Sequence, residues 1–351
     1  MEKPLSSKAR YAFVDALRGV AALWVVLFHA YAKNVRAMTG YELPQPLDAI
    51  FGNGHLGVDI FFVISGFVIA QSIRDAHITP KFIGWFALRR SLRLDPPYWV
   101  TIASMIVLSY ISGRLQRDHA PLPQPTWDAV IAHLFYLQGF LGYPQIVGVF
   151  WTLCYEMQFY LMLVILTGIA QWPRVAWLSR WFVFAPLWVV SAVCIAGSTW
   201  PAALSLYGWP YFFLGVTVNW VHNRKEPPLA LAIVVAATAA LLPFEPLKTA
   251  VALVTAIAIY RASVTGRLAS LTLGRVAQYL GRISYSLYLV HMLVGTPAVR
   301  FGIRHLGKMG FGTAMALILL AVAASVAAAH VMYVLVERPA VRWSHRLREL
   351  G

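Results

Sequence analysis

Long apolar stretches alternate with short polar and basic stretches along almost the whole chain. Segments of roughly 15 to 25 apolar residues match the length that an α-helix needs to cross a bilayer. The pattern therefore predicts ten membrane-spanning helices, of which 229–243 and 248–261 are the shortest. The predicted spans are 12–32, 56–74, 96–112, 150–170, 181–197, 202–221, 229–243, 248–261, 282–300 and 312–336.

One connecting stretch, at about 113–149, is much longer than the others. It contains Pro121, Pro123 and Pro125, followed by an apolar patch from Val130 to Phe140. Prolines disfavour a continuous helix, and an apolar patch next to a membrane tends to lie on it. We expect a loop and then a helix on the outer leaflet, or dipping into it.

Composition agrees with a polytopic membrane protein. The 351 residues are 59% hydrophobic and only 12% charged, with a mean hydropathy of +0.65, whereas a soluble domain carries about a quarter charged residues. The apolar runs leave no room for a soluble module, so one all-α transmembrane domain is predicted over residues 1–351. Cys154 and Cys194 lie inside apolar runs and are expected to be ordinary packed residues, and no metal site is predicted.

Positive charge is distributed along the chain as an orientation signal. With the amino terminus placed in the cytoplasm, the inside segments carry 20 Lys and Arg residues and the outside segments carry 8. Basic residues concentrate on the cytoplasmic side of membrane proteins, so both termini are predicted to be cytoplasmic. The net charge of +15 is explained in this way, and nucleic-acid binding is not expected.

The first span carries two ionisable groups, Arg18 and His29. They are eleven residues apart, about 16 Å along a helix, so Arg18 is predicted in the inner half and His29 near the outer end. Ionisable groups inside a membrane are costly and commonly mark a site or a pathway. We interpret His29 as a candidate general base, although a histidine at a helix end can simply lie at the interface.

Other ionisable residues are predicted in the outer half of the bundle. Glu156 lies in the outer half of its span, Asp59 lies at the outer end of the second span, and His291 lies near the midplane. A carboxylate beside a histidine fixes the orientation of the ring, so convergence of Asp59 and Glu156 with His29 is expected, with His291 as a further candidate. Asp59 can instead cap its helix, and His291 can simply bond a neighbouring helix.

Arg90 and Arg93 lie three residues apart, just inside the membrane. On a helix they share one face, and two guanidinium groups at that spacing suit a phosphate group. The alternative is that they are only positive-inside residues.

Six sequence blocks follow one another along nearly the whole chain: Asp15–Gly19 with His29, Gly57–Phe67, Arg90–Leu94, Trp151–Leu161, Ile283–His291 and Val336–Pro339. In this order they resemble the acyltransferase 3 family of integral-membrane acyltransferases. Two departures are Ala16, where glycine is common in that family, and Asp95-Pro96, which replaces a more usual Tyr-Pro pair.

The resemblance implies transfer of an acyl group, usually acetyl from cytoplasmic acetyl-CoA, to a hydroxyl of a glycan or lipid-linked sugar. Arg18, Arg90, Arg93 and Tyr285 would bind the donor. His29 would take the hydroxyl proton, with Glu156 or Asp59 orienting it or stabilising charge. Ser65 is a conceivable acyl carrier, so direct transfer and a covalent intermediate both stay open.

The expected location is a bacterial inner membrane, with possible glycan-assembly partners. One alternative is a transporter or flippase that uses Arg18, His29 and Glu156 as a relay. A second alternative is a non-catalytic partner in a glycan export complex.

Overall fold

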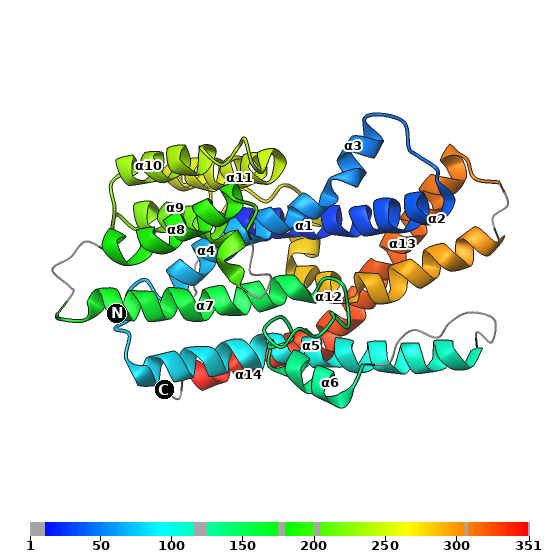
Figure 1. The fold of residues 1–351 in the computed structure, drawn as a ribbon, viewed down its shortest axis with the longest axis horizontal. Helices are drawn as coiled ribbons and strands as arrows, with labels where there is room; N and C mark the ends of the chain where they lie inside the picture. Colours follow the sequence, from blue (N-terminus) through cyan, green and yellow to red (C-terminus); the bar gives the residue numbers. More distant parts are fainter. Residues whose placement is uncertain (1–10, 116–124, 175–179, 200–203, 306–307, 350–351) are drawn as a thin grey trace, which may run out of the picture.

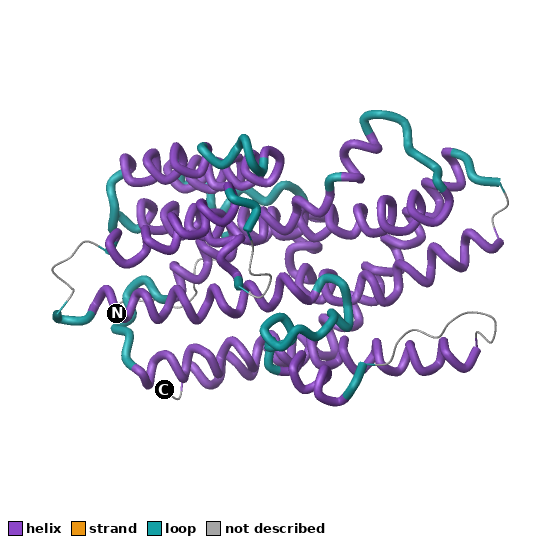
Figure 2. The backbone as a smooth tube through the Cα atoms, in the orientation of Figure 1, coloured by secondary structure: helices purple, strands orange, loops and turns teal. Residues whose placement is uncertain are grey.

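The computed structural model describes residues 11–115, 125–174, 180–199, 204–305 and 308–349. In these ranges the chain forms helices joined by turns and loops, with no strand (Figures 1 and 2). The all-α class predicted from the sequence is therefore confirmed. Pro121 and Pro123, in the predicted outer loop, lie outside the described residues.

The elements follow one another in a simple order. They are α1 (Ala12–Ala30), π-helix η1 (Tyr31–Arg36), α2 (Ala37–Thr39), α3 (Leu47–Gly52), η2 (Gly54–Leu56), α4 (Gly57–Ser72), α5 (Pro80–Leu115), α6 (Trp127–Leu134), α7 (Phe150–Gln171), α8 (Trp181–Ala196), η3 (Ser205–Gly208), α9 (Trp209–His222), α10 (Pro228–Ala239), α11 (Pro246–Val264), α12 (Arg275–His305), α13 (Phe311–Met332), π-helix η4 (Tyr333–Glu337) and α14 (Arg338–Glu349).

A helix occupies most of the described part of each of the ten predicted spans, although α4 ends at Ser72, α8 at Ala196 and α10 at Ala239, before the predicted ends at 74, 197 and 243. In the described part of the chain, six continuous helical stretches are long and apolar enough to cross a membrane, and α8 and α10 are shorter apolar helices. The protein is thus an integral membrane protein. The six stretches are Ala12–Thr39, Gly54–Ser72, Phe150–Gln171, Pro246–Val264, Arg275–His305 and Phe311–Ser344.

Two pairs of helices pack against each other with very short distances between their backbones. The α1–α12 pair and the α4–α9 pair both meet through glycines, where a Cβ atom would collide with the opposite backbone. A Cβ on Gly281 of α12 would lie 1.9 Å from the Asp15 carbonyl oxygen, and one on Gly66 of α4 would lie 1.9 Å from the Phe212 carbonyl oxygen. Small residues allow such close helix packing inside membranes.

The long helix α5 runs along one edge of the bundle, with α14 beside it, while α8 to α11 gather at the opposite edge (Figure 1). The α1–α12 pair and α7 lie between these edges (Figure 1). Side chains from α1, α5, α7 and α12 can therefore meet in the interior.

The helix expected over the patch from Val130 to Phe140 is shorter than predicted. It is α6, which ends at Leu134, and the chain then turns through Tyr136, whose φ is 58°. The turn inserts Tyr136 against α5, where its ring stacks on Tyr98 at 4.8 Å and its hydroxyl donates to Asp95 at 2.9 Å. This buried contact ends the helix, although the sequence stays apolar.

His133 fastens α6 to the segment before α7. Its Nδ1–H donates to the Ala129 carbonyl at 2.7 Å, and its Nε2 accepts from the Ile146 amide at 3.1 Å. Only a neutral ring makes both bonds. Burial lowers the pKa of His133 from its ordinary 6.5, against a smaller opposing effect of the Ala129 bond.

The contact between His133 and the Ile146 amide is therefore expected to open as the pH falls. Below pH 6.5 the His133 ring binds a proton when the contact is open but not when it is closed, so the stability of the closed contact is lost as pH falls from 6.5 towards the lowered pKa. We expect the Ile146 amide to exchange faster at about pH 5.5 than at about pH 7.5, after correction for intrinsic rates. In His133→Gln this extra pH dependence should vanish. An equal pH response in both proteins would contradict the assignment.

Candidate functional site

His29 lies near the carboxyl end of α1 and faces α12. Its Nδ1–H donates to the Val25 carbonyl at 2.9 Å, because the carbonyl can only accept. The neutral ring therefore keeps its lone pair on Nε2, the atom that a general base needs. The His29 residue is of intermediate burial.

The ring of His291 lies beside the ring of His29. The two centroids are 4.8 Å apart, with the planes at 64°. His291 is 2% exposed, and its Nδ1–H donates to the carbonyls of Tyr288 at 2.8 Å and Leu287 at 3.2 Å. Its Nε2 is buried and has no partner among the described residues. The α1–α12 contact therefore brings together two imidazoles of the same tautomer.

Glu156, on α7, is held by two hydroxyl groups. Ser65 of α4 donates to Glu156 Oε1 at 2.7 Å, and Tyr160, one turn along α7, donates to the same oxygen. The guanidinium of Arg90 lies 4.8 Å from the centroid of the Tyr160 ring. The carboxylate is therefore linked to the basic segment of α5 through Tyr160. Ser65, the conceivable acyl carrier, has its hydroxyl engaged with this carboxylate.

Arg18 crosses from α1 to α12. Its Nε donates to Ser284 Oγ at 3.3 Å, and its guanidinium lies 6.0 Å from the ring of Phe61. The charges of Arg18 and Arg90 are both within electrostatic reach of Tyr160. Arg18 and Arg90 thus lie near the Glu156–Tyr160 pair, and Arg93 lies within electrostatic reach of Arg90.

Glu337 is an acidic residue of this cluster that the sequence prediction omitted. It is 7% exposed, and its Oε2 accepts from the Ser286 amide at 3.2 Å and from Ser286 Oγ at 2.6 Å. It lies within electrostatic reach of Arg93 and Arg18. The signal was available, since a carboxylate inside an apolar run is as costly here as at Glu156.

Two more predicted site residues take other positions. Tyr285 is buried and its hydroxyl donates to the Leu94 carbonyl at 2.7 Å, which fastens α12 to the part of α5 that carries Arg93. Asp59 is 4% exposed and lies within electrostatic reach of Lys248 and Glu245 near α11. Their roles in donor binding and in catalysis stay predictions.

The expected convergence on His29 is therefore only partly reproduced by the contacts. His291 joins His29, whereas Glu156 joins the arginines and Asp59 faces the charged pair of α11. Within the described residues, no group of His, Cys, Asp or Glu side chains has the arrangement of a metal site. Cys154 and Cys194 are free thiols.

The sequence is similar to that of known proteins over nearly its whole length. A family model described as an acyltransferase domain matches residues 11–334. Acyltransferase MdmB of Streptomyces mycarofaciens is 27% identical over 96% of this chain and 93% of its own length. Exopolysaccharide production protein ExoZ of Rhizobium meliloti is 28% identical over 90% of this chain and 95% of its own.

Similarity to a third relative is more local. Peptidoglycan O-acetyltransferase OatA of Listeria monocytogenes is 28% identical over 42% of this chain and 23% of its own length. No solved structure matches the chain.

Proposed function

The chain belongs to this acyltransferase family, and from that membership we propose that it moves an acyl group, most simply acetyl, from cytoplasmic acyl-CoA to a hydroxyl of a glycan or lipid-linked sugar. The names of ExoZ and OatA refer to an exopolysaccharide and to peptidoglycan O-acetylation, which supports a glycan acceptor. One observation carries the proposal. Arg18 and Arg90 both lie within electrostatic reach of Tyr160, which donates to Glu156, while His29 lies farther along the same helix as Arg18.

In the proposed topology, residues 1–351 form one domain of ten spans in the inner membrane of a bacterial cell. Both termini lie in the cytoplasm. This orientation places the arginine cluster nearer the cytoplasm and His29 nearer the outside. Acyl-CoA carries phosphate groups, which guanidinium groups bind well. Arg90 and Arg93 are the proposed phosphate ligands, and Arg18 completes the positive field. Proteins of glycan assembly are the proposed partners.

The proposed reaction is a direct transfer. His29 Nε2 removes the proton of the acceptor hydroxyl as the oxygen attacks the thioester carbonyl carbon. The carbon–sulfur bond then breaks, the acyl group stays on the acceptor oxygen, and the CoA thiolate leaves and takes the proton back from the His29 imidazolium. Before the reaction, the Nδ1–H bond from His29 to the Val25 carbonyl keeps the neutral ring in the tautomer whose Nε2 can accept a proton.

The test is donor consumption by the purified protein. Labelled acetyl-CoA is supplied with a panel of glycan acceptors, and free CoA and labelled glycan are measured. The proposal predicts that both accumulate in equal amounts with at least one acceptor. Movement of a solute across reconstituted vesicles without donor consumption would favour the transporter alternative instead.

Loss of the two α5 arginines is expected to weaken donor binding. Arg90→Ala with Arg93→Ala should raise the KM for acetyl-CoA by about 10- to 100-fold. Each charge-assisted hydrogen bond to a phosphate contributes about 1.5–3 kcal/mol, and water molecules in the variant replace part of that lost binding energy. The kcat should change by less than about threefold. Arg89→Ala is the matched control, since Arg89 is the adjacent arginine and its Nε donates to Trp85 of the same helix. An unchanged KM in the double variant would refute the donor role.

A further inference from the structure

A second cationic site lies away from the acyl-transfer residues. A cavity of about 210 Å³ opens where α4 and α7 end and α8 begins, beside the end of α9. Among the described residues, its charged lining consists of Arg74, Arg180 and Lys225, and its uncharged polar lining includes Gln171 and Thr167. Neither the proposed donor site nor the proposed base uses any of these side chains.

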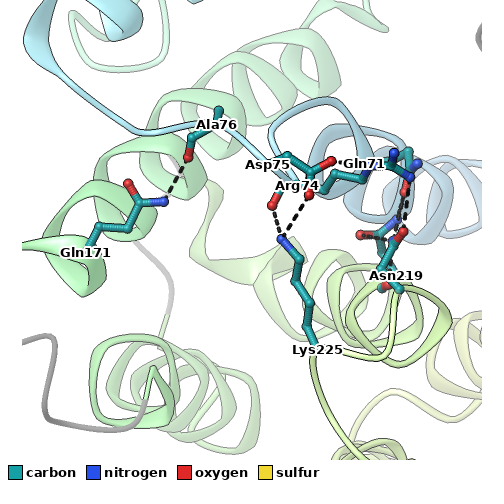
Figure 3. Close-up of polar contacts among 8 residues, drawn as sticks. Gln71, Arg74, Asp75, Ala76, Gln171, Asn219 and Lys225 are labelled. Carbon is teal, nitrogen blue, oxygen red and sulfur yellow. Dashed lines mark hydrogen bonds and ion pairs between the residues drawn. The ribbon is translucent and has the colours of Figure 1, made fainter.

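Hydrogen bonds and ion pairs hold the cations in place. Lys225 donates to the Arg74 carbonyl and lies 3.7 Å from Asp75 Oδ1, while Arg74 contacts Asp75 at 2.5 Å and Asn223 at 3.3 Å (Figure 3). Asp75 is a mainly exposed carboxylate, with 69% of its side chain accessible. The loop after α4, which carries Arg74 and Asp75, is held against α7 because Gln171 donates to the Ala76 carbonyl at 2.9 Å (Figure 3).

Arg180, just before α8, is the third cation of the lining. Its guanidinium lies 5.0 Å from the Trp220 ring, and its Nε lies 3.2 Å from Glu226 Oε1. An arginine has five N–H donors and a lysine has three, so these contacts leave donors for a ligand. The cavity is thus a preorganised cluster of cationic donors, which suits a phosphate group.

The position of the cavity favours a lipid as the source of that phosphate. Trp172 and Phe182 are exposed beside it, at 55% and 69%, and exposed aromatic residues at helix ends mark the membrane–water interface. A volume of about 210 Å³ is small for a whole nucleotide, since pockets for drug-sized ligands start near 300 Å³. Basic pockets between helices at this level bind anionic lipid headgroups.

We propose that this cavity binds the phosphate headgroup of an anionic phospholipid. The Arg180 and Lys225 side chains bond the phosphate oxygens, and the apolar surface near Phe182 accommodates the acyl chains. This inference does not depend on the acyl-transfer reaction, and its test does not measure it.

The test is lipid binding to the purified full-length chain in neutral detergent, followed by native mass spectrometry. Phosphatidylglycerol should bind saturably, about tenfold more tightly than phosphatidylcholine. Arg180→Gln with Lys225→Gln should lower the phosphatidylglycerol affinity by about tenfold or more. The matched control is Lys81→Gln with Arg267→Gln, which removes two exposed cations outside the cavity and should leave the affinity unchanged.

A second variant, which removes no charge, keeps the test decisive if the first variant fails to fold. Ala170 lines the cavity, so Ala170→Phe should fill it without removing charge and should also weaken phosphatidylglycerol binding. Equal binding of the two lipids, or unchanged binding in both variants, would overturn the proposal. Displacement of phosphatidylglycerol by CoA or by inorganic phosphate, lost in the Arg180/Lys225 variant, would also overturn it by identifying a soluble phosphate ligand.

Discussion

Replacing His29 by alanine is expected to lower kcat for acyl transfer by about 10²- to 10⁴-fold, the usual contribution of a general base. The fold should survive, because the side chain is partly exposed and its hydrogen bond to the Val25 carbonyl stays within α1. The affinity for acyl-CoA should also persist, since the proposed phosphate ligands lie elsewhere. Initial rates with saturating donor and acceptor measure the first effect, and donor titration measures the second.

His305 offers a matched control for this prediction. It is a second histidine whose Nδ1–H donates to the carbonyl four residues earlier, that of Phe301, at 2.7 Å, but it is exposed at the end of α12. His305→Ala should retain wild-type turnover. If His29→Ala also retained wild-type turnover, His29 would not be the base.

The second large effect is expected at the contact between α1 and α12. Adding a methyl group in Gly281→Ala would place a Cβ atom 1.9 Å from the Asp15 carbonyl oxygen and 2.7 Å from its carbon. Backbone cannot yield as a flexible side chain does, so the helices must separate. We expect a loss of about 3 kcal/mol or more in the free energy of unfolding, the upper range for overpacking. Thermal unfolding in detergent measures it.

Separation of these helices should also abolish activity in any protein that still folds. The same pair aligns Arg18 with Ser284 and His29 with His291. Gly84→Ala is the control, because Gly84 lies within α5 and a Cβ atom there meets no other atom within 4 Å. That change should be neutral or stabilise the helix by about 0.5–1 kcal/mol. Equal unfolding midpoints for the two variants would contradict the close-contact argument.

The helices were predictable because apolar length is a local property of the sequence. Most of each predicted span is helical where described, whereas α5 begins at Pro80, well before its predicted span of 96–112, and thus includes the basic segment. The end of α6 was not predictable, since it depends on the distant contact of Tyr136 with Tyr98 and Asp95. Local apolarity carries no information about which side chain a turn will bury.

The sequence named the ionisable residues of the candidate site, but it predicted neither their pairings nor the position of Glu156. Glu156 was expected in the outer half with His29, whereas Tyr160 links it to Arg90 and lies within electrostatic reach of Arg18, eleven residues before His29 on α1. The carboxylate faces Ser65 and Tyr160, and His29 faces His291 instead. The pairing of His29 with His291 follows from the close α1–α12 contact that the glycines allow, and the Ser65–Glu156 bond follows from the packing of α4 on α7, so both require the tertiary structure.

The central claim is that the donor binds from the cytoplasmic side and that the acyl group leaves on an external acceptor. Labelled acetyl-CoA, which is strongly charged, supplied to sealed membrane vesicles of the two orientations tests it most directly. Inside-out vesicles should incorporate label into glycan within their lumen, and right-side-out vesicles should not. Incorporation by right-side-out vesicles of proven integrity, with none in inside-out vesicles, would contradict the account.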